Sequence, residues 1–174
     1  DNGLGVAGVA PGAAILPLKC GYRVGQKDFL PLSAVVQAIN EAISAKVDVI
    51  NMSLGLPDDN AAMRVVIDRA VQNNILLIAA VGNDYSSIKN YPATYSNVVG
   101  VGAVDRSGRW APYSNNNSSV WITAPGSAIC GLGYKTDNEY IGTWDGTSLA
   151  APAVAGLAAM ARQADPGITV TEFF

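Results

Sequence analysis

The sequence predicts an α/β domain built on a doubly wound, mostly parallel sheet with helices on both faces. Two observations support this prediction. Strand-like and helix-like segments alternate along the chain, and this order requires crossover connections between parallel strands. The strand-like segments are continuous rather than alternating apolar runs, which indicates that both faces of the sheet are covered.

The first part of the chain contributes two strand-like and two helix-like segments. Residues 14–20 form an apolar run typical of extended structure. Apolar side chains recur at helical spacing through residues 33–45, and Ser33 is the expected N-cap. Residues 47–54 begin with β-branched side chains and predict a buried strand. Residues 60–73 show the second helical pattern, with one apolar face.

The second part of the chain predicts three further strands, a hairpin or turn, and a third helix. Residues 75–81 and 98–104 are continuous apolar runs of strand length. Residues 120–124 predict a short strand, and residues 132–144 predict a hairpin or turn. Small apolar side chains occur nearly all round the segment 148–163, which predicts a buried helix.

Length and composition restrict the function classes. A chain of 174 residues suits one domain, and with 49% hydrophobic and 14% charged residues it can bury a large core. The formal net charge of −3 and the lack of a Lys/Arg cluster argue against nucleic-acid binding. No apolar run approaches the ~18 residues of a membrane span. The first residues do not have the pattern of a signal peptide.

The absence of histidine is the most informative feature of the composition. Histidine is the usual general base and the commonest metal ligand, so the chain by itself lacks the usual side chain for both tasks. The two cysteines, Cys20 and Cys130, are compatible with one disulfide or with two buried thiols. We favour buried thiols, because cysteine is often a small core residue and no spacing suggests a metal site.

The segment from Gly146 to Pro152 carries features of a nucleophilic serine. Ser148 falls in the first turn of a predicted helix, so its hydroxyl lies near the positive end of the helix dipole and its backbone N–H is an unpaired donor. A nucleophile needs both properties. Gly146 leaves room for a substrate, and Pro152 is expected in the first turn, where proline is tolerated. On these residues alone, an N-cap role for Ser148 is the alternative.

This segment resembles the nucleophile motif of the subtilisin-like serine peptidases, the subtilases. Six further segments resemble family motifs and occur in the family's order: GVAGVAP at 5–11, VINMSLG at 49–55, AAVGN at 79–83, YPA at 91–93, VVGVGAV at 98–104 and APG at 124–126. The resemblance extends over essentially the whole chain. It implies a partial subtilisin-like peptidase domain over residues 1–174, without the N-terminal aspartate and histidine portion and without the extreme C-terminal portion.

The resemblance implies roles for individual residues. Ser148 would be the nucleophile, and the Asn83 side chain would stabilise the oxyanion together with the Ser148 backbone N–H. The matching dipeptide Tyr91-Pro92 would carry a cis peptide bond, with a trans turn as the alternative. Two groups of residues would bind substrate, one by pairing with an extended peptide and one by lining the pocket for the residue before the scissile bond. They are Ser53, Leu54 and Gly55 for the first group, and Ala79, Ala80, Val81 and Gly82 for the second.

The resemblance implies no cofactor for catalysis. Asn2, Leu4 and Val6 align with a calcium-binding loop of several family members, but the other ligands would lie upstream of this chain. Calcium is therefore expected only in a longer parent protein. The glycines between Gly3 and Gly8 fit a dinucleotide-binding pattern, which we dismiss because no strand precedes them and Pro11 breaks the helix that should follow.

The expected function is hydrolysis of peptide bonds in peptide or protein substrates, through a serine acyl-enzyme. Because the chain has no histidine, we expect it to be inactive by itself and to need the N-terminal part of the same peptidase as a partner. Secretion is a further expectation from the family. The alternative is a catalytically dead module that binds peptides in the same groove.

Overall fold

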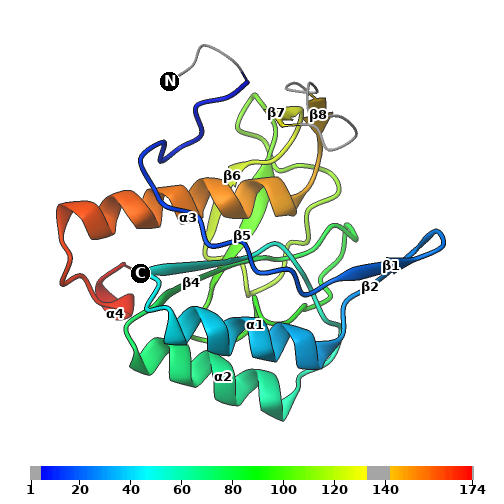
Figure 1. Ribbon diagram of the computed structural model, residues 1–174. Helices are drawn as coiled ribbons and strands as arrows, with labels where there is room; N and C mark the ends of the chain where they lie inside the picture. Colours follow the sequence, from blue (N-terminus) through cyan, green and yellow to red (C-terminus); the bar gives the residue numbers. More distant parts are fainter. Residues whose placement is uncertain (1–4, 133–141, 174) are drawn as a thin grey trace.

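A parallel sheet of four strands forms the centre of the computed structural model, which describes residues 5–132 and 142–173. Neighbouring strands follow the order β3-β4-β5-β6. Helices α1 and α2 lie on one face of the sheet, and α3 lies on the other (Figure 1). The predicted α/β class, with helices on both faces of a parallel sheet, is therefore confirmed. The bounds are Val49–Met52 for β3, Leu76–Ala80 for β4, Val99–Val104 for β5 and Ile122–Pro125 for β6.

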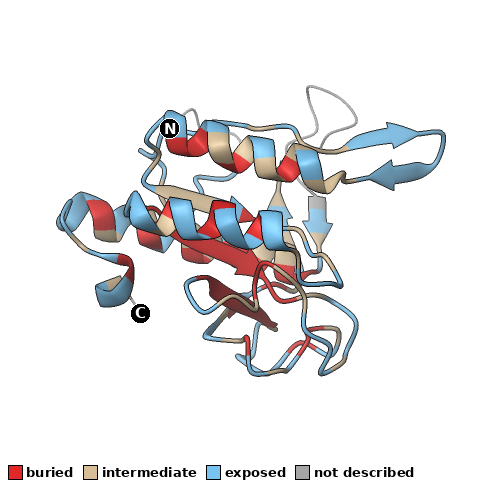
Figure 2. Ribbon diagram, turned by 90° about the horizontal axis from the view of Figure 1, so that it is seen from below, coloured by how far each residue is buried: buried red, intermediate tan, exposed pale blue. Residues whose placement is uncertain are grey.

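The middle strand β4 shows why its sequence is continuously apolar. Every residue of β4 is buried. Leu76 and Ile78 belong to the apolar cluster that includes α3, whereas Leu77 and Ala79 pack with α1 and α2. Alternate side chains therefore face two different helical layers. Buried residues concentrate in such strands and on the helix faces turned toward them (Figure 2).

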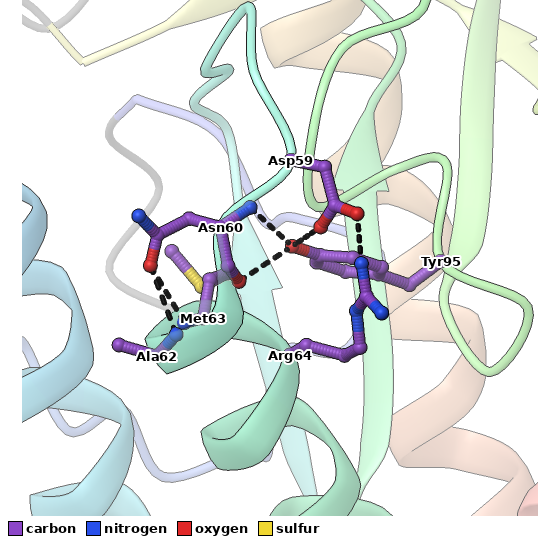
Figure 3. Close-up of polar contacts among 6 residues, drawn as sticks. All are labelled: Asp59, Asn60, Ala62, Met63, Arg64 and Tyr95. Atoms are coloured by element: carbon purple, nitrogen blue, oxygen red, sulfur yellow. Dashed lines mark hydrogen bonds and ion pairs between the residues drawn. The ribbon is translucent and has the colours of Figure 1, made fainter.

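Helix α1 spans Leu32–Ser44 and α2 spans Ala61–Gln72. The predicted N-cap of α1 is wrong, because Pro31 takes that position with extended backbone and Ser33 is already inside the helix. A proline before a helix has no N–H that needs a partner. The N-cap of α2 is Asn60, whose Oδ1 accepts hydrogen bonds from the backbone N–H groups of Ala62 and Met63 (Figure 3).

The predicted alternation of strands and helices holds in the first part of the sheet, where α1 precedes β3 and α2 joins β3 to β4. Segments 81–98 and 105–121 connect β4 to β5 and β5 to β6, and neither contains a helix. These two irregular segments begin at the carboxyl ends of β4 and β5. Open parallel sheets bind ligands at this edge.

The run 14–20 was predicted to be extended, but it joins no β-strand of the described part of the chain. Ile15 is 87% exposed. An apolar run forms a strand only when another strand pairs with its backbone. Instead, a short antiparallel hairpin that the sequence did not indicate follows this run, with β1 at Tyr22–Val24 and β2 at Lys27–Phe29.

Three further predictions gave more burial than the structure has. The strand predicted to be buried at 47–54 is shorter, and β3 is only partly buried because it is an edge strand. Helix α3, at Thr147–Ala164, is not buried all round, since Leu157 and Met160 are about half exposed. Both cysteines are free thiols, but Cys130 is exposed and Cys20 is half-buried, so the prediction of buried thiols is wrong.

The C-terminal part completes the fold. Strands β7, Ile129–Gly131, and β8, Gly142–Trp144, pair antiparallel, so a hairpin is present but begins before the predicted range 132–144; its expected tip lies outside the described residues. A short helix α4, Val170–Phe173, ends the described chain. Arg162 of α3 is buried and donates to the carbonyl oxygens of Ile168 and Asn74, so it ties the segment between α3 and α4 to the turn before β4.

Candidate active site

The entry into α3 is built around Gly146, the N-cap of that helix. Its φ of 156° and ψ of 150° are a conformation used almost only by glycine. The Gly146 N–H donates to the carbonyl oxygen of Gly126 at 2.9 Å and to the Tyr113 hydroxyl at 3.1 Å. That hydroxyl in turn donates to Gly126 O at 2.6 Å. The start of α3 is therefore held against the end of β6.

Ser148 is the second residue of α3 and is half-buried. Because Gly146 is the N-cap and no side chain makes a capping hydrogen bond there, the alternative role of Ser148 as an N-cap is wrong. The Ser148 N–H is one of the first N–H groups of the helix, which have no helical partner. Pro152 is the sixth helix residue, counting Thr147 as the first, so its predicted place in the first turn is also wrong.

Asn83 lies beside this helix start. Its Oδ1 accepts hydrogen bonds from the backbone N–H of Thr147 at 2.8 Å and from the Thr147 hydroxyl at 2.9 Å. Both bonds use the oxygen of the amide, so the orientation of the side chain is set and Nδ2 is turned the other way. The residue as a whole is exposed to solvent.

Two N–H donors flank one point in front of Gly146. A Cβ built on Gly146 would lie 3.4 Å from Leu149 Cδ2 and 3.6 Å from both Asn83 Nδ2 and the Ser148 backbone nitrogen. Since glycine has no Cβ, no side chain of residue 146 fills the space between these two donors. A carbonyl oxygen that becomes negatively charged there would be stabilised by both donors, and the Ser148 hydroxyl belongs to the same turn. The arrangement suits attack by a serine on a carbonyl group.

The loop that carries Asn83 is anchored by Asn115, which is fully buried. The Asn115 side chain accepts from the Asp84 N–H at 2.9 Å and donates to the Val81 carbonyl at 3.1 Å. Its backbone N–H donates to Gly82 O at 3.0 Å. The sequence showed only a polar loop at 114–119, so the position of Asn115 under the site was missed. Tyr113, which directly precedes this loop, was also missed.

The predicted peptide-pairing residues follow β3 at the edge of the sheet. Ser53 and Gly55 are exposed, and Leu54 is half-buried. The Ser53 hydroxyl donates to the Ser148 carbonyl oxygen at 2.9 Å, so this edge and α3 are in direct contact. Just beyond it, Leu56 pairs with Tyr91 through two backbone hydrogen bonds. The predicted cis peptide bond at Tyr91-Pro92 is confirmed.

The residues predicted to line the pocket occupy different positions. Ala79 and Val81 are completely buried in the layer with α1 and α2, whereas Ala80 packs in the layer with α3. Alternate strand residues point to opposite faces, so these side chains do not form one wall. Gly82 is half-buried with a φ of 109°, and a Cβ there would meet the Asn115 side chain at 2.5 Å. A role for the backbone of this segment stays a prediction.

The predicted calcium loop falls mostly outside the described part of the chain. Asn2 and Leu4 lie outside the described residues, and Val6 is exposed. Within residues 5–132 and 142–173, no three His, Cys, Asp or Glu side chains are grouped as metal ligands. In the same part of the chain, no helix has the length and apolar character of a membrane span.

A separate surface depression lies at the start of α2, on the face of the sheet opposite α3. It includes Asp59, Arg64 and Tyr95, which are joined by hydrogen bonds (Figure 3). Burial raises the pKa of the Tyr95 phenol, and the Asp59 carboxylate raises it further, while the Asn60 N–H acts in the other direction. This network caps the helix and contains none of the predicted site residues.

Curated relatives match nearly the whole chain. A thermostable alkaline protease of Halalkalibacterium halodurans is 38% identical over 169 residues, which cover 97% of this chain and 45% of that protein. Subtilisin E of Bacillus subtilis is 38% identical over 170 residues, which cover 95% of this chain and 43% of that protein. The chain therefore spans about half the length of the curated relatives that it matches.

Solved structures agree with these relatives. Proteases from Pseudoalteromonas arctica superpose with a TM-score of 0.85 at 34% identity, covering 99% of this chain and 57% of that chain. A cold-adapted subtilisin-like serine proteinase has a TM-score of 0.74 at 30% identity, covering 81% and 51%. The profile of the subtilase family matches residues 1–173. This protein chain therefore belongs to the subtilase family.

Proposed function

We propose that this chain is the nucleophile-bearing and oxyanion-stabilising part of a serine endopeptidase. The observation that carries the proposal is the pair of donors in front of Gly146, Asn83 Nδ2 and the Ser148 N–H, at the start of the helix that carries Ser148. Membership of a family of serine peptidases supports it. The substrate would be a peptide or protein chain extended along Ser53, Leu54 and Gly55, whose backbone lies at the exposed end of an edge strand.

In the proposed reaction, Ser148 Oγ attacks the carbonyl carbon of the scissile peptide bond. Its proton passes to a general base, the carbonyl oxygen becomes an oxyanion between the two donors, and the C–N bond then breaks with the proton delivered to the leaving amine. Water releases the acyl group in a second step of the same kind. No metal or organic cofactor takes part in this scheme.

The base would come from outside these 174 residues, which contain no histidine. We therefore propose that the chain alone is inactive and that the N-terminal part of the same peptidase completes the site. Triad members act as a unit, so a serine without its base retains little reactivity. A relative is named a minor extracellular protease, and we propose the same extracellular location here.

A fluorophosphonate probe tests the proposal. The chain is treated alone, then with the separately purified upstream segment of the parent protein, and the label is located by mass spectrometry. We expect labelling of Ser148 only in the mixture, and none in a Ser148→Ala variant. A fluorogenic peptide with an internal cleavage site checks endopeptidase activity in the mixture. If circular dichroism shows a folded mixture and Ser148 still remains unlabelled, the proposed enzyme function is wrong and the peptide-binding alternative is favoured.

A further inference from the structure

Helix α3 lacks one of its regular hydrogen bonds close to Ser148. In an α-helix, each backbone N–H donates to the carbonyl four residues earlier. The residue four positions after Ser148 is Pro152, which lies inside α3 and has no N–H. The Ser148 carbonyl oxygen therefore loses the donor that the helix would otherwise supply.

A hydroxyl from another element takes the place of this donor. Ser53 follows β3, 95 residues earlier in the chain, and its Oγ donates to the Ser148 carbonyl oxygen at 2.9 Å. Asn51 Nδ2 donates to Ser53 Oγ at 3.1 Å. Because the Ser53 oxygen accepts from Asn51, its own proton is directed to the remaining partner, the Ser148 carbonyl. The three residues form a chain of donors from β3 to α3.

We propose that Ser53 is a positioning residue for Ser148, because its hydroxyl replaces the hydrogen bond that Pro152 removes from the helix. This inference rests on the proposed function. The bond holds the peptide plane that directly follows Ser148, and this plane determines how the residue is oriented at the start of α3. A carbonyl without a partner tilts out toward solvent. Ser53 thus links the peptide-pairing edge to the nucleophile through its side chain, while its backbone stays available for a substrate.

The hydrogen bond itself is tested without any activity. In the folded chain labelled with ¹³C, the carbonyl resonance of Ser148 is compared among variants. We expect an upfield shift in Ser53→Ala and little change in Ser53→Thr, which keeps the hydroxyl. Ser44→Ala is the matched control, since Ser44 Oγ also donates to a helix carbonyl, that of Asn40 at 3.0 Å, but in α1 on the opposite face. A Ser148 resonance that is unchanged in Ser53→Ala overturns the inference.

The positioning role is tested by a double-mutant cycle with Pro152→Ala, which restores a backbone N–H four residues after Ser148. With the upstream segment present, we expect Ser53→Ala to slow fluorophosphonate labelling about tenfold, as for a nucleophile displaced by a fraction of an ångström. Ser44→Ala should label at the wild-type rate, and Ser53→Thr, which keeps the hydroxyl, should recover most of the rate that Ser53→Ala loses. In the Pro152→Ala background, the same Ser53→Ala change should cost less than about twofold, because the helix now supplies the donor.

The outcomes separate this inference from the proposed function. If wild type is labelled and Ser53→Ala is labelled equally fast, Ser53 does not position the nucleophile. If Ser53→Ala slows labelling by the same factor with and without Pro152→Ala, the hydroxyl acts elsewhere and the inference is wrong. If wild type is never labelled, the proposed function fails, and the carbonyl resonance alone decides whether Ser53 holds Ser148 in place.

Discussion

Replacing Asn115 by alanine should destabilise the fold by about 3 kcal/mol. The side chain is fully buried and accepts from the Asp84 N–H at 2.9 Å. It also donates to the carbonyl oxygens of Val81 at 3.1 Å and Ile88 at 3.3 Å. Each such bond contributes about 1 kcal/mol, and removing the amide leaves its partners without a replacement in a buried place.

The measurement is urea unfolding of the chain followed by circular dichroism, with thermal unfolding as a second probe. A loss of about 3 kcal/mol corresponds to a decrease in Tm of roughly 6 to 12 °C for a domain of this size. The neighbouring Asn116 provides the matched control, because its side chain is exposed. Asn116→Ala should change stability by less than about 0.5 kcal/mol. If Asn115→Ala is no more destabilising than this control, the loop that carries Asn83 is not held by Asn115.

Three further predictions concern the scaffold. Gly100→Ala should lower the free energy of unfolding in urea by more than about 3 kcal/mol, because the new Cβ would lie 1.9 Å from the backbone oxygen of Ser119. A variant with wild-type stability would contradict this close approach. Asn60→Ala should cost about 1 kcal/mol through loss of the α2 N-cap, and an unchanged Tm would speak against that cap. The backbone N–H of Arg109 lowers the pKa of the Asp105 carboxyl from its usual 3.8, so the stability that ionised Asp105 contributes is present above that pH and is lost as the pH falls through the lower pKa of the folded state. In unfolding measured against pH, Asp105→Asn should lose less stability over this range than the wild type. Identical acid profiles of the two proteins would refute this prediction.

Local patterns located the elements whose residues are buried by their immediate surroundings. The apolar run 75–81 becomes β4 and the amphipathic segment 60–73 becomes α2, each within two residues of the predicted bounds. Periodicity works here because burial on one or both faces repeats along the element. The prediction of extended structure at 14–20 did not yield a strand, because the apolar character of this run does not indicate whether another strand pairs with it.

The position of Ser148 at a helix start and of Asn83 after a buried strand could be predicted, the latter with the help of the family resemblance. Their hydrogen-bond partners could not. Asn115, Tyr113 and the Ser53 hydroxyl reach the site from segments far away in the chain. No short-range pattern distinguishes a polar loop residue that turns inward from one that stays in solvent.

The sequence by itself determined the α/β class, the order of the main strands and helices, and the family to which the motifs point. These properties follow from composition and from neighbouring residues, because the chain must bury its apolar faces at fixed periods. Only the tertiary structure decided that Asn83 Nδ2 and the Ser148 N–H flank the same space and that Ser53 replaces the donor missing at Pro152. Such contacts join residues tens of positions apart, and their distances depend on how the sheet brings its loops together.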